Sequence, residues 1–423
     1  MTSPHGLRII PVSDRAWLMA ALGDALAGGA PILPVNDAHT DDSTADDTGP
    51  SADLPGGTAV VIRTSGSSGV PKSVALSAAA LRASAEATHE RLGGPGQWLV
   101  ALPAQLISGL QMLVRSAVAG TSPVFFDGPF VPEALLETAE AMTHERRYIS
   151  LVPVQLARVL DLAERDEDAA EVFRRFDAVL VGGQAVTLEL RRRAHALGVA
   201  LKRSYGMSET AGGCVYDGVE IGDTLVRIRG GEVQLAGPAL ALGYVGDDNL
   251  TNEHFITEPS GERWYRTGDA GELLGGMLTV TGRLDRVIIS GGINVSLDEV
   301  ERIVRALPGW GEAVALGVPD RDWGERVHLV RAISANSNTT NAHEAGAEAA
   351  GVATASFAEA GERIRAALGV AAVPVGESTV DAIPRLAGEK PDLVALAARC
   401  GLGAPESTPA VPTSQINHTK EQA

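Results

Sequence analysis

A loop of glycine, hydroxyl and lysine side chains is the first part of the sequence that could carry out chemistry. It directly follows a short apolar segment and reads Thr64-Ser65-Gly66-Ser67-Ser68-Gly69-Val70-Pro71-Lys72. Glycines let backbone amides approach a ligand closely, hydroxyl groups can donate to phosphate oxygens, and the lysine adds a compact positive charge. Pro71 stands where a Walker loop has its second glycine. We therefore predict a phosphate-binding loop of another kind, with a flexible surface turn as the alternative.

Two further loops each present a carboxylate. Glu209 lies between two hydroxyl residues at the end of the run Tyr205-Gly206-Met207-Ser208-Glu209-Thr210, which follows a predicted strand. Such a carboxylate suits Mg²⁺, which takes few protein oxygens together with phosphate oxygens and water. Asp269 follows the glycine of Tyr265-Arg266-Thr267-Gly268, a common way to hold a ribose diol. The alternatives are a solvated loop acid for Glu209 and, for Asp269, a turn that caps its own backbone.

The C-terminal third adds two more glycine-containing loops. Gly282-Arg283-Leu284-Asp285-Arg286 leads into Ser290-Gly291-Gly292, and Ile383–Pro391 presents Lys390. Lysine is rare here, since only four of the 35 basic residues are lysines. A lysine that stands in a glycine-rich loop therefore points to a need for a compact ammonium group. Each loop alone is ambiguous, but five in this order are specific.

The elements that must position these loops alternate between strand-like and helix-like patterns. A strand over Ala59–Arg63 precedes the first loop, and a helix opens at Ser77 and continues to about Leu92. The further expected strands are Trp98–Leu102, Val124–Phe126, Ile149–Val152, Ala178–Val181 and Val199–Lys202, and the expected helices include Pro132–Thr143 and Leu188–Leu197. This alternation predicts an α/β fold with a mostly parallel sheet.

The pattern changes after Tyr205. Short strands and Gly-Gly turns between Thr224 and Ile289 predict a β-rich subdomain. A small α+β unit then follows, with expected helices Ser296–Arg305 and Phe357–Leu368 and strands Ala313–Val318 and Val327–Ala332. We expect a large domain over residues 1–284 with a flexible acidic insertion at 36–57, a small mobile C-terminal lid domain over 285–402 with a flexible insertion at 336–353, and a disordered tail over 403–423.

Composition bounds the class of protein. The chain has 423 residues, 45% of them hydrophobic, with a formal charge of −18 and a pI near 4.9. It should repel nucleic acid and anionic membranes, and it has no apolar run of the ~20 residues that a membrane span needs. Residues 1–12 lack a signal-peptide pattern, so we expect a cytoplasmic protein. Two cysteines, Cys214 and Cys400, exclude a disulfide scaffold or a cysteine-built metal site.

Taken together, the segments resemble the signature motifs of the adenylate-forming superfamily, which contains acyl-CoA synthetases, nonribosomal adenylation domains and luciferases. The matching segments span residues 64–391 and read TSGSSGVPK, VGGQA (181–185), YGMSET, GPALALGY (237–244), YRTGD, GRLDRVIISGG and the final lysine loop. Within the superfamily the chain is similar to the short o-succinylbenzoate–CoA ligases of actinobacteria, which act in menaquinone synthesis. SYGMSETAGGCVYDG (204–218), LPAQLISGLQMLVRS (102–116) and the abbreviated N-terminal region carry this narrower resemblance.

The resemblance implies ATP, Mg²⁺ and CoA as reactants and assigns a role to each loop. The first loop would hold the triphosphate through Thr64, Ser65, Gly66, Ser67, Ser68, Gly69 and Lys72. Gly183, Gln184 and Tyr205 would line the adenine site, Gly206 would also bind ATP, and Ser208 would touch the phosphates. Glu209 would bind Mg²⁺, and Asp269 would grip the ribose with Arg283 nearby.

The resemblance also implies a moving C-terminal domain. Lys390 would bridge the substrate carboxylate and the α-phosphate during adenylation, where a cation is needed between two anions. Asp285 would be the hinge, and Ser290, Gly291 and Gly292 would reach the CoA channel in the second half-reaction. The chain departs from the pattern at Leu106, where many relatives have histidine, at Ser208, where threonine is frequent, and in the sequence Arg-Leu-Ala-Gly-Glu-Lys of the last loop.

The acyl pocket would be built from residues 106–113 and 210–213, with Leu106, Ser108, Gly109, Arg115, Thr210 and Gly212 as its predicted members. Succinylbenzoate carries two carboxylates, so one needs a partner other than Lys390, and we assign Arg115 to it as a hypothesis. The alternative is an ordinary surface arginine that pairs with an acid.

The sequence is compatible with three hypotheses about the function. The first is an ATP-dependent acid–CoA ligase for o-succinylbenzoate. The second is an adenylating ligase that loads another aryl or alkyl acid onto CoA or a carrier protein. The third is a non-catalytic nucleotide-binding relative. The expected partners are a small carboxylic acid, ATP and CoA, without nucleic acid or membrane insertion, and the resemblance allows a homodimer.

Overall fold

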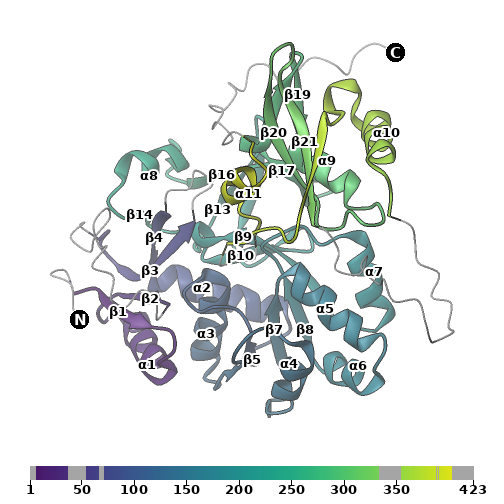
Figure 1. Ribbon diagram of the computed structural model, residues 1–423. Helices are drawn as coiled ribbons and strands as arrows, with labels where there is room; N and C mark the ends of the chain where they lie inside the picture. Colours follow the sequence, from purple (N-terminus) through teal and green to yellow (C-terminus); the bar gives the residue numbers. More distant parts are fainter. Residues whose placement is uncertain are drawn as a thin grey trace. The chain divides into compact units, whose positions relative to one another are not determined.

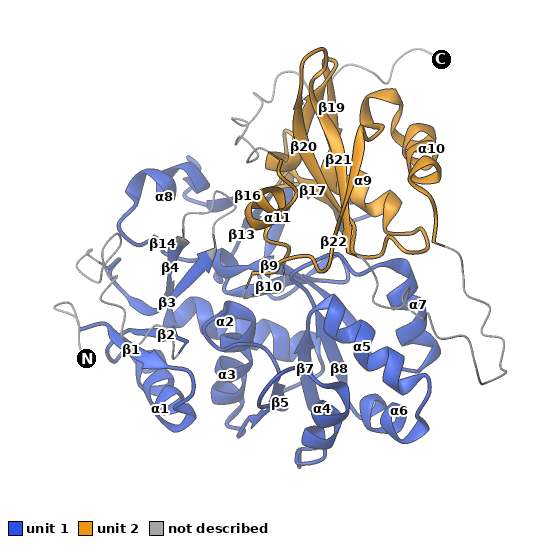
Figure 2. Cartoon of the chain, viewed as in Figure 1, with its two compact units in different colours: residues 1–227, 234–267, 273–279 blue, residues 228–233, 268–272, 280–423 orange. Residues whose placement is uncertain are grey.

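The chain forms two compact units in the computed structural model, which describes residues 6–36, 54–65, 71–332, 354–386, 388 and 390–402. The first unit comprises residues 1–227, 234–267 and 273–279, and the second comprises 228–233, 268–272 and 280–423 (Figure 2). Most of the expected insertions at 36–57 and 336–353, the tail at 403–423 and residues 66–70 of the first loop lie outside the described residues.

The first sheet of the N-terminal unit has the strand order β1-β2-β3-β4-β14. These strands are β1 (Arg8–Pro11), β2 (Ile32–Val35), β3 (Thr58–Ser65), β4 (Pro71–Ser77) and β14 (Gly243–Tyr244), and α1 (Arg15–Leu26) connects β1 to β2. β1, β2 and β3 are parallel, whereas β4 runs antiparallel to both β3 and β14. The strand expected over residues 59–63 is present as β3 and is longer than expected, since it extends from Thr58 to Ser65.

The sequence did not predict β4. The Ser/Gly loop therefore joins two antiparallel strands rather than a strand and a helix, with Thr64 opposite Lys72 in the register. Val74, Ala75 and Leu76 are all buried, so this short run is extended because its partners β3 and β14 complete its hydrogen bonds. The helix α2 (Ala78–Arg91) begins where expected, because the Ser77 hydroxyl accepts a hydrogen bond from the Ala80 amide at 3.0 Å.

The second sheet is the main α/β sheet, with the strand order β11-β10-β9-β8-β7-β5-β6. Its strands are β5 (Gln97–Val100), β6 (Val124–Phe125), β7 (Arg147–Leu151), β8 (Ala178–Val181), β9 (Leu201–Met207), β10 (Gly212–Tyr216) and β11 (Val219–Glu220). The strands β5 to β9 are parallel, and β10 and β11 continue the sheet in antiparallel pairs. The prediction of an α/β fold with a mostly parallel sheet is confirmed.

Helices cover both faces of this sheet (Figure 1). Alternate residues of β5, β7 and β8 divide between two cores: Trp98, Tyr148 and Leu180 pack with α2 and α3 (Ile107–Ala119), whereas Leu99, Ile149 and Val179 pack on the other side. The second face is covered by α4 (Pro132–Ala139), α5 (Pro153–Ala163), α6 (Glu167–Arg174) and α7 (Leu188–Ala196). This alternation follows from the period of two in a strand.

The β-rich region expected between 224 and 289 is present. Its sheet has the order β12-β13-β16-β15, with β17 beside β16. The elements are β12 (Leu225–Arg229), β13 (Glu232–Ala236), α8 (Asp248–His254), β15 (Phe255–Thr257), β16 (Arg263–Leu274) and β17 (Met277–Arg283). Residues 228–233 and 268–272 of this region are grouped with the second unit.

The second unit is built mainly on a sheet with the order β19-β18-β21-β20, in which β22 also pairs with β21. The strands are β18 (Val287–Ser290), β19 (Ile293–Ser296), β20 (Val314–Asp320), β21 (Gly324–Ala332) and β22 (Gly376–Val380), and the helices are α9 (Leu297–Val304), α10 (Phe357–Leu368) and α11 (Leu393–Arg399). Trp310 is fully buried in its core with Ile288, Val300 and Leu329. The expected helix Phe357–Leu368 coincides with α10.

None of the helices in the described part of the chain combines the length and the apolar character that a membrane crossing requires.

Candidate active site

Glu209 lies on a single 3-10 turn, Ser208–Thr210, directly after β9. The Thr210 hydroxyl accepts from the Met207 amide at 3.0 Å, which closes the turn. The sequence placed Tyr205, Gly206 and Met207 in a loop after a strand, and this is wrong, because all three belong to β9. The strand extends this far because β10 pairs with it from Ser204 to Met207, beyond the last residue that pairs with β8, Arg203.

The residue after this turn, Ala211, has a positive φ of 49°, which is uncommon for a residue with a Cβ atom. Its carbonyl oxygen accepts two hydrogen bonds, from the Ser84 hydroxyl at 3.0 Å and from Gln111 Nε2 at 2.6 Å. Contacts from α2 and α3 thus hold this left-handed backbone next to Glu209. Backbone that is fixed against its own preference is typical of functional sites.

The Glu209 side chain is half-buried and is held at one oxygen. Oε1 accepts a hydrogen bond from the Tyr244 hydroxyl at 2.9 Å, and the backbone oxygen of Glu209 accepts from the Ala241 amide at 2.8 Å. Among the described residues, none donates a hydrogen bond to Oε2. Within the same part of the chain, no group of three or more His, Cys, Asp or Glu side chains could hold a metal ion by itself. One available carboxylate oxygen fits a Mg²⁺ that takes its remaining ligands from phosphate and water.

Lys72 lies on β4, in the other sheet of the same unit. Its backbone oxygen accepts from the Thr64 hydroxyl at 3.4 Å, and its Nζ lies 5.6 Å from the ring centroid of Tyr244. The structure therefore brings Lys72 and Glu209 to the same tyrosine, with Lys72 over its ring and Glu209 at its hydroxyl. The roles of Ser65, Gly66, Ser67, Ser68 and Gly69 stay predictions, because residues 66–70 and the Ser65 side chain lie outside the described residues.

The predicted adenine-site residues and the predicted ATP-binding residue Gly206 lie at the ends of neighbouring strands. Gly183 and Gln184 follow β8, and Tyr205 and Gly206 are near the end of the parallel strand β9. Ligands of α/β proteins bind at this carboxyl edge of the sheet. At Gly206, φ is 156° and a Cβ atom would lie 2.1 Å from the Gly212 carbonyl oxygen, so only glycine fits between β9 and β10.

The two stretches predicted to form the acyl pocket lie side by side. Gln111, on α3, donates to the Ala211 oxygen, and a Cβ atom at Gly212 would lie 3.1 Å from Gln111 Cγ. Leu106 and the exposed Ser108 stand at the start of α3, and Thr210 closes the turn beside it. Gly109 is required by packing, since a Cβ atom there would lie 2.2 Å from the Pro103 oxygen.

Arg115 is one helical turn beyond Gln111 and is buried, with 3% of its surface exposed. Its guanidinium lies 4.8 Å from the Trp98 ring centroid, and Nη2 donates to the Tyr216 hydroxyl at 3.4 Å. It forms no ion pair with a described carboxylate, and its Nε has no hydrogen-bond partner there. The alternative interpretation, a surface arginine paired with an acid, is wrong, because α3 is buried from Gly109 to Ser116. Burial lowers the pKa of Arg115 from its usual value.

Several neighbours of Arg115 also carry unpaired polar atoms. Trp98 Nε1, His89 Nε2 and Gln111 Oε1 are buried without a hydrogen-bond partner among the described residues. Burial, and then the positive charge of Arg115, lower the pKa of His89 to about 4. Buried polar atoms are normally hydrogen-bonded, so water or an anionic ligand bound at this group would supply the missing partners.

In the second unit, Arg283 pairs with two of the predicted acids. Its Nη1 lies 3.2 Å from Asp269 Oδ1, and it forms two hydrogen bonds to Asp285, at 3.0 and 2.9 Å. The Arg283 amide donates to Asp298 Oδ2 at 2.7 Å. The ribose-binding and hinge candidates thus form one ionic cluster, and sequence reasoning missed Asp298 because no motif marks it.

A buried ionic network next to this cluster fixes α9. Glu301 accepts from Arg286 at 2.6 Å and from Arg305 at 2.6 Å, and Arg286 also pairs with Asp298 at 2.9 Å. Burial alone would lower the pKa of Arg286, but the carboxylates of Glu301 and Asp298 raise it above its usual value. Burial also raises the pKa of Asp298, against the effect of Arg286.

The remaining predicted residues of the second unit differ in exposure. Ser290 is fully buried, whereas Gly291 and Gly292 are exposed at the turn between β18 and β19. Gly291 packs against Trp323, whose ring would lie 2.5 Å from a Cβ atom at this position. Lys390 is exposed and forms no ion pair with any residue that the structure describes, and its backbone oxygen accepts from the Leu386 amide at 2.8 Å. Its neighbour Glu389 lies outside the described residues.

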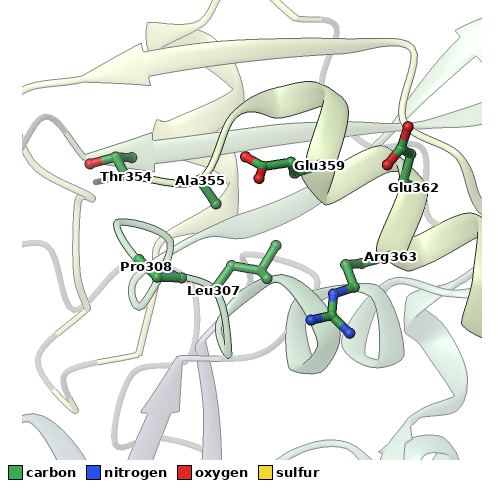
Figure 3. A pocket seen from close by; sticks show the side chains of 7 residues that line it. All are labelled: Leu307, Pro308, Thr354, Ala355, Glu359, Glu362 and Arg363. Carbon is green, nitrogen blue, oxygen red and sulfur yellow. The ribbon is translucent and has the colours of Figure 1, made fainter. Parts of the chain in front are cut away.

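A hollow of about 520 Å³ in the second unit involves none of the predicted residues. It lies between the turn at Leu307 and Pro308 and the start of α10, where Glu359, Glu362 and Arg363 line it (Figure 3). Glu359 already caps α10 through Ser356. We assign no role in the reaction to this hollow.

Comparison with known proteins decides the family. The model of the AMP-binding enzyme family matches residues 25–274. A probable 2-succinylbenzoate–CoA ligase of Mycobacterium tuberculosis is 39% identical over 334 residues, which cover 76% of this chain and 83% of that protein. This chain belongs to the AMP-binding enzyme family. The resemblance inferred from the motifs is confirmed.

Solved structures of AMP-binding enzymes show the same fold. A variant of Escherichia coli MenE with bound OSB-AMS is 26% identical, with a TM-score of 0.69 over 94% of this chain and 88% of that chain. Bacillus subtilis O-succinylbenzoate coenzyme A synthetase in complex with ATP and magnesium is 25% identical, with a TM-score of 0.62 over 79% of this chain and 68% of that chain. In this AMP-binding enzyme, the family match contains Lys72, Glu209 and Asp269, whereas Asp285 and Lys390 lie beyond it.

Proposed function

We propose that this AMP-binding enzyme is an ATP-dependent acid–CoA ligase that acts on o-succinylbenzoate. The buried Arg115, with no carboxylate partner among the described residues, is the observation that supports this substrate. A cation without an acid is costly in a protein core, and an anionic substrate that supplies the missing partner would offset this cost. The likeness to the mycobacterial ligase supports the same choice.

The proposed reaction has two steps. In the first, a carboxylate oxygen of the acid attacks the α-phosphorus of ATP, the bond to the β-phosphate oxygen breaks, and pyrophosphate leaves. In the second, the thiolate of CoA attacks the acyl carbon, the bond to AMP breaks, and a thioester forms. The first step joins two anions, so it requires positive charge at the point where they meet.

Each charged residue has a separate part in this scheme. Lys72 and the Ser/Gly loop bind the triphosphate, and Asp269 with Arg283 binds the ribose. Glu209 offers one carboxylate oxygen to Mg²⁺, which when bound neutralises phosphate charge. Lys390 supplies the positive charge for adenylation, and its exposed side chain suits a group that acts in one half-reaction only. Asp285 serves as the hinge, and the loop Ser290–Gly292 serves the CoA step.

Leu106 bears on substrate choice. It is half-buried at the N-cap position of α3 and makes no side-chain cap. An apolar side chain there suits the aromatic ring of the acid, whereas the histidine of many relatives would add a titratable group. We therefore expect the acyl pocket to favour an aryl acid.

Pyrophosphate release tests the function. The purified protein is assayed with ATP, Mg²⁺ and a panel of carboxylic acids, with and without CoA, beside the variant Lys390→Ala. Release with o-succinylbenzoate that rises with CoA, and that Lys390→Ala abolishes, supports the proposal. Release with another acid, or only with a carrier-protein thiol, keeps the chemistry and overturns the substrate. Nucleotide binding without release from any acid would instead indicate a non-catalytic relative.

A further inference from the structure

Tyr244 is fixed close to Lys72 by backbone hydrogen bonds. It ends β14, where it pairs with Val74 of β4. On either side of it, the Leu242 amide donates to the Ala75 oxygen and the Val245 amide donates to the Ser73 oxygen, each at 2.8 Å. The backbone that carries Tyr244 is thus bound to the strand that carries Lys72.

The segment from Ala241 to Tyr244 also forms two hydrogen bonds with Glu209. The Tyr244 hydroxyl donates to Glu209 Oε1 at 2.9 Å, and the Ala241 amide donates to the Glu209 oxygen at 2.8 Å. The Arg263 guanidinium in turn holds this segment, because it donates hydrogen bonds of 2.5 and 2.7 Å to the backbone oxygens of Ala241 and Leu242. Side chain and backbone of Glu209 are therefore held by one anchored segment of the other sheet.

Aromatic contacts restrict the Tyr244 ring. His254 and Phe255 each pack edge-on with ring centroids 5.9 Å away, and the Tyr265 hydroxyl lies 3.5 Å from that of Tyr244. Only 4% of the Tyr244 surface is exposed, yet its ring keeps Lys72 Nζ at 5.6 Å from the centroid. These contacts restrict the ring to one orientation, in which its hydroxyl lies close to Glu209 Oε1 and to the Tyr265 hydroxyl.

We propose that Tyr244 is a positioning residue that aligns Glu209 and Lys72 for the magnesium nucleotide. Its hydroxyl occupies Oε1 of Glu209 and so leaves Oε2 for the metal, and its ring face orients the Lys72 ammonium by a cation–π contact. A fixed carboxylate loses less side-chain freedom when the metal binds, which makes binding tighter. This inference rests on the proposed function, since it needs Glu209 as the magnesium ligand.

Two variants separate the two contacts. Tyr244→Phe removes only the hydroxyl, whereas Tyr244→Leu also removes the ring face. We measure equilibrium binding of ATP without any acid substrate, once with Mg²⁺ and once with EDTA. For Tyr244→Phe we expect the factor by which Mg²⁺ increases the affinity for ATP to fall about tenfold, while the affinity in EDTA is unchanged. For Tyr244→Leu the affinity in EDTA should fall as well, because Lys72 loses its support.

Matched variants make the result decisive. Tyr148→Phe removes a buried tyrosine hydroxyl that bonds to the oxygens of Leu92 and Gly94, away from Glu209, and should leave both affinities unchanged. Glu209→Gln tests the premise. If it abolishes the effect of Mg²⁺ while Tyr244→Phe keeps it in full, the inference is wrong and the proposed function stands. If Glu209→Gln itself keeps the effect, the proposed role of Glu209 is wrong and the inference fails with it. Tyr244→Phe and Tyr244→Leu both remove the hydroxyl. If only one of them folds, the effect of Mg²⁺ on its ATP affinity still tests the inference.

Discussion

The guanidinium carbon of Arg115 lies 4.8 Å from the ring centroid of Trp98, deep in the core of the N-terminal unit. The Tyr216 hydroxyl accepts from Arg115 Nη2 on a second side, and the Thr88 hydroxyl bonds to Tyr216 at 2.9 Å. Aromatic rings and hydroxyls can hold a guanidinium in place without neutralising it. The charge of Arg115 therefore stays available to an anion.

Arg115→Met should weaken binding of a dicarboxylic substrate. The variant loses a charge-assisted contact, so we expect the KM for o-succinylbenzoate to rise by about tenfold to a hundredfold while ATP binding is unchanged. Steady-state kinetics measures this. An analogue without the second carboxylate should be used equally by both proteins. Arg82→Met, which removes a helix arginine that bonds to the Leu26 oxygen, is the control. An unchanged KM in Arg115→Met would remove Arg115 from the acyl site.

The same substitution should not destabilise the protein. Replacing a buried cation that has no acid partner among the described residues with an apolar side chain of similar length removes a desolvation cost. We expect the free energy of unfolding of Arg115→Met to be the same as that of the wild type or up to about 1 kcal/mol higher, as measured by urea denaturation at pH 7. A large loss of stability would mean that the guanidinium contributes to the fold rather than to a ligand.

Gly109 should tolerate no side chain. Gly109→Ala places a Cβ atom 2.2 Å from the Pro103 oxygen, so we expect a loss of about 2 kcal/mol in the free energy of unfolding, from overpacking. Gly23 is the matched control, since it also lies in a helix but a Cβ atom there would have nothing within 4 Å. Gly23→Ala should raise stability by about 0.5 to 1 kcal/mol, because alanine is the better helix former. Equal effects at the two positions would contradict the predicted contact.

Glu301 should be the most sensitive acid of α9. Glu301→Gln leaves the buried Arg286 with a weaker partner and removes the carboxylate that pairs with Arg305, so we expect a loss of about 3 kcal/mol in the free energy of unfolding. Glu299, on the same helix, pairs with Arg302 at 3.8 Å in solvent. Glu299→Gln should change stability by less than about 0.5 kcal/mol. Chemical denaturation of both variants tests the contrast, which fails if Glu299→Gln costs as much.

His89 should make stability depend on acid pH. Its pKa in the folded protein is about 4, because burial and Arg115 oppose its charge, whereas in the unfolded chain it is near 6.5. The unfolded state therefore binds the proton first as the pH falls below about 6.5. The wild type then loses up to about 1.4 kcal/mol per pH unit relative to His89→Gln, and this loss ends near pH 4. Urea denaturation of both proteins at pH 7, 5.5 and 4.5 measures the difference, and parallel pH profiles would contradict the burial of His89.

The sequence by itself determined the order of the loops, the α/β class and the caps of two helices. Ser77 and Ser296 begin their helices as predicted, because a cap depends on residues within one turn. The run of motifs likewise identified the family, since glycines and hydroxyls beside a lysine or an acid are local requirements of phosphate chemistry.

Only the tertiary structure decided which side chains meet. β4 and the last residues of β9 are strands because partner strands supply their hydrogen bonds: β3 and the distant β14 for β4, and β10 for the end of β9. Tyr244 stood in a quoted motif without a role, and it gained one only when β14 paired with β4 and placed its hydroxyl on Glu209. The sequence left a surface arginine as the alternative for Arg115, and only the burial of α3 between α2 and the sheet excluded it. Burial and long-range pairing are properties of the whole fold, so the sequence could name these residues but not their partners.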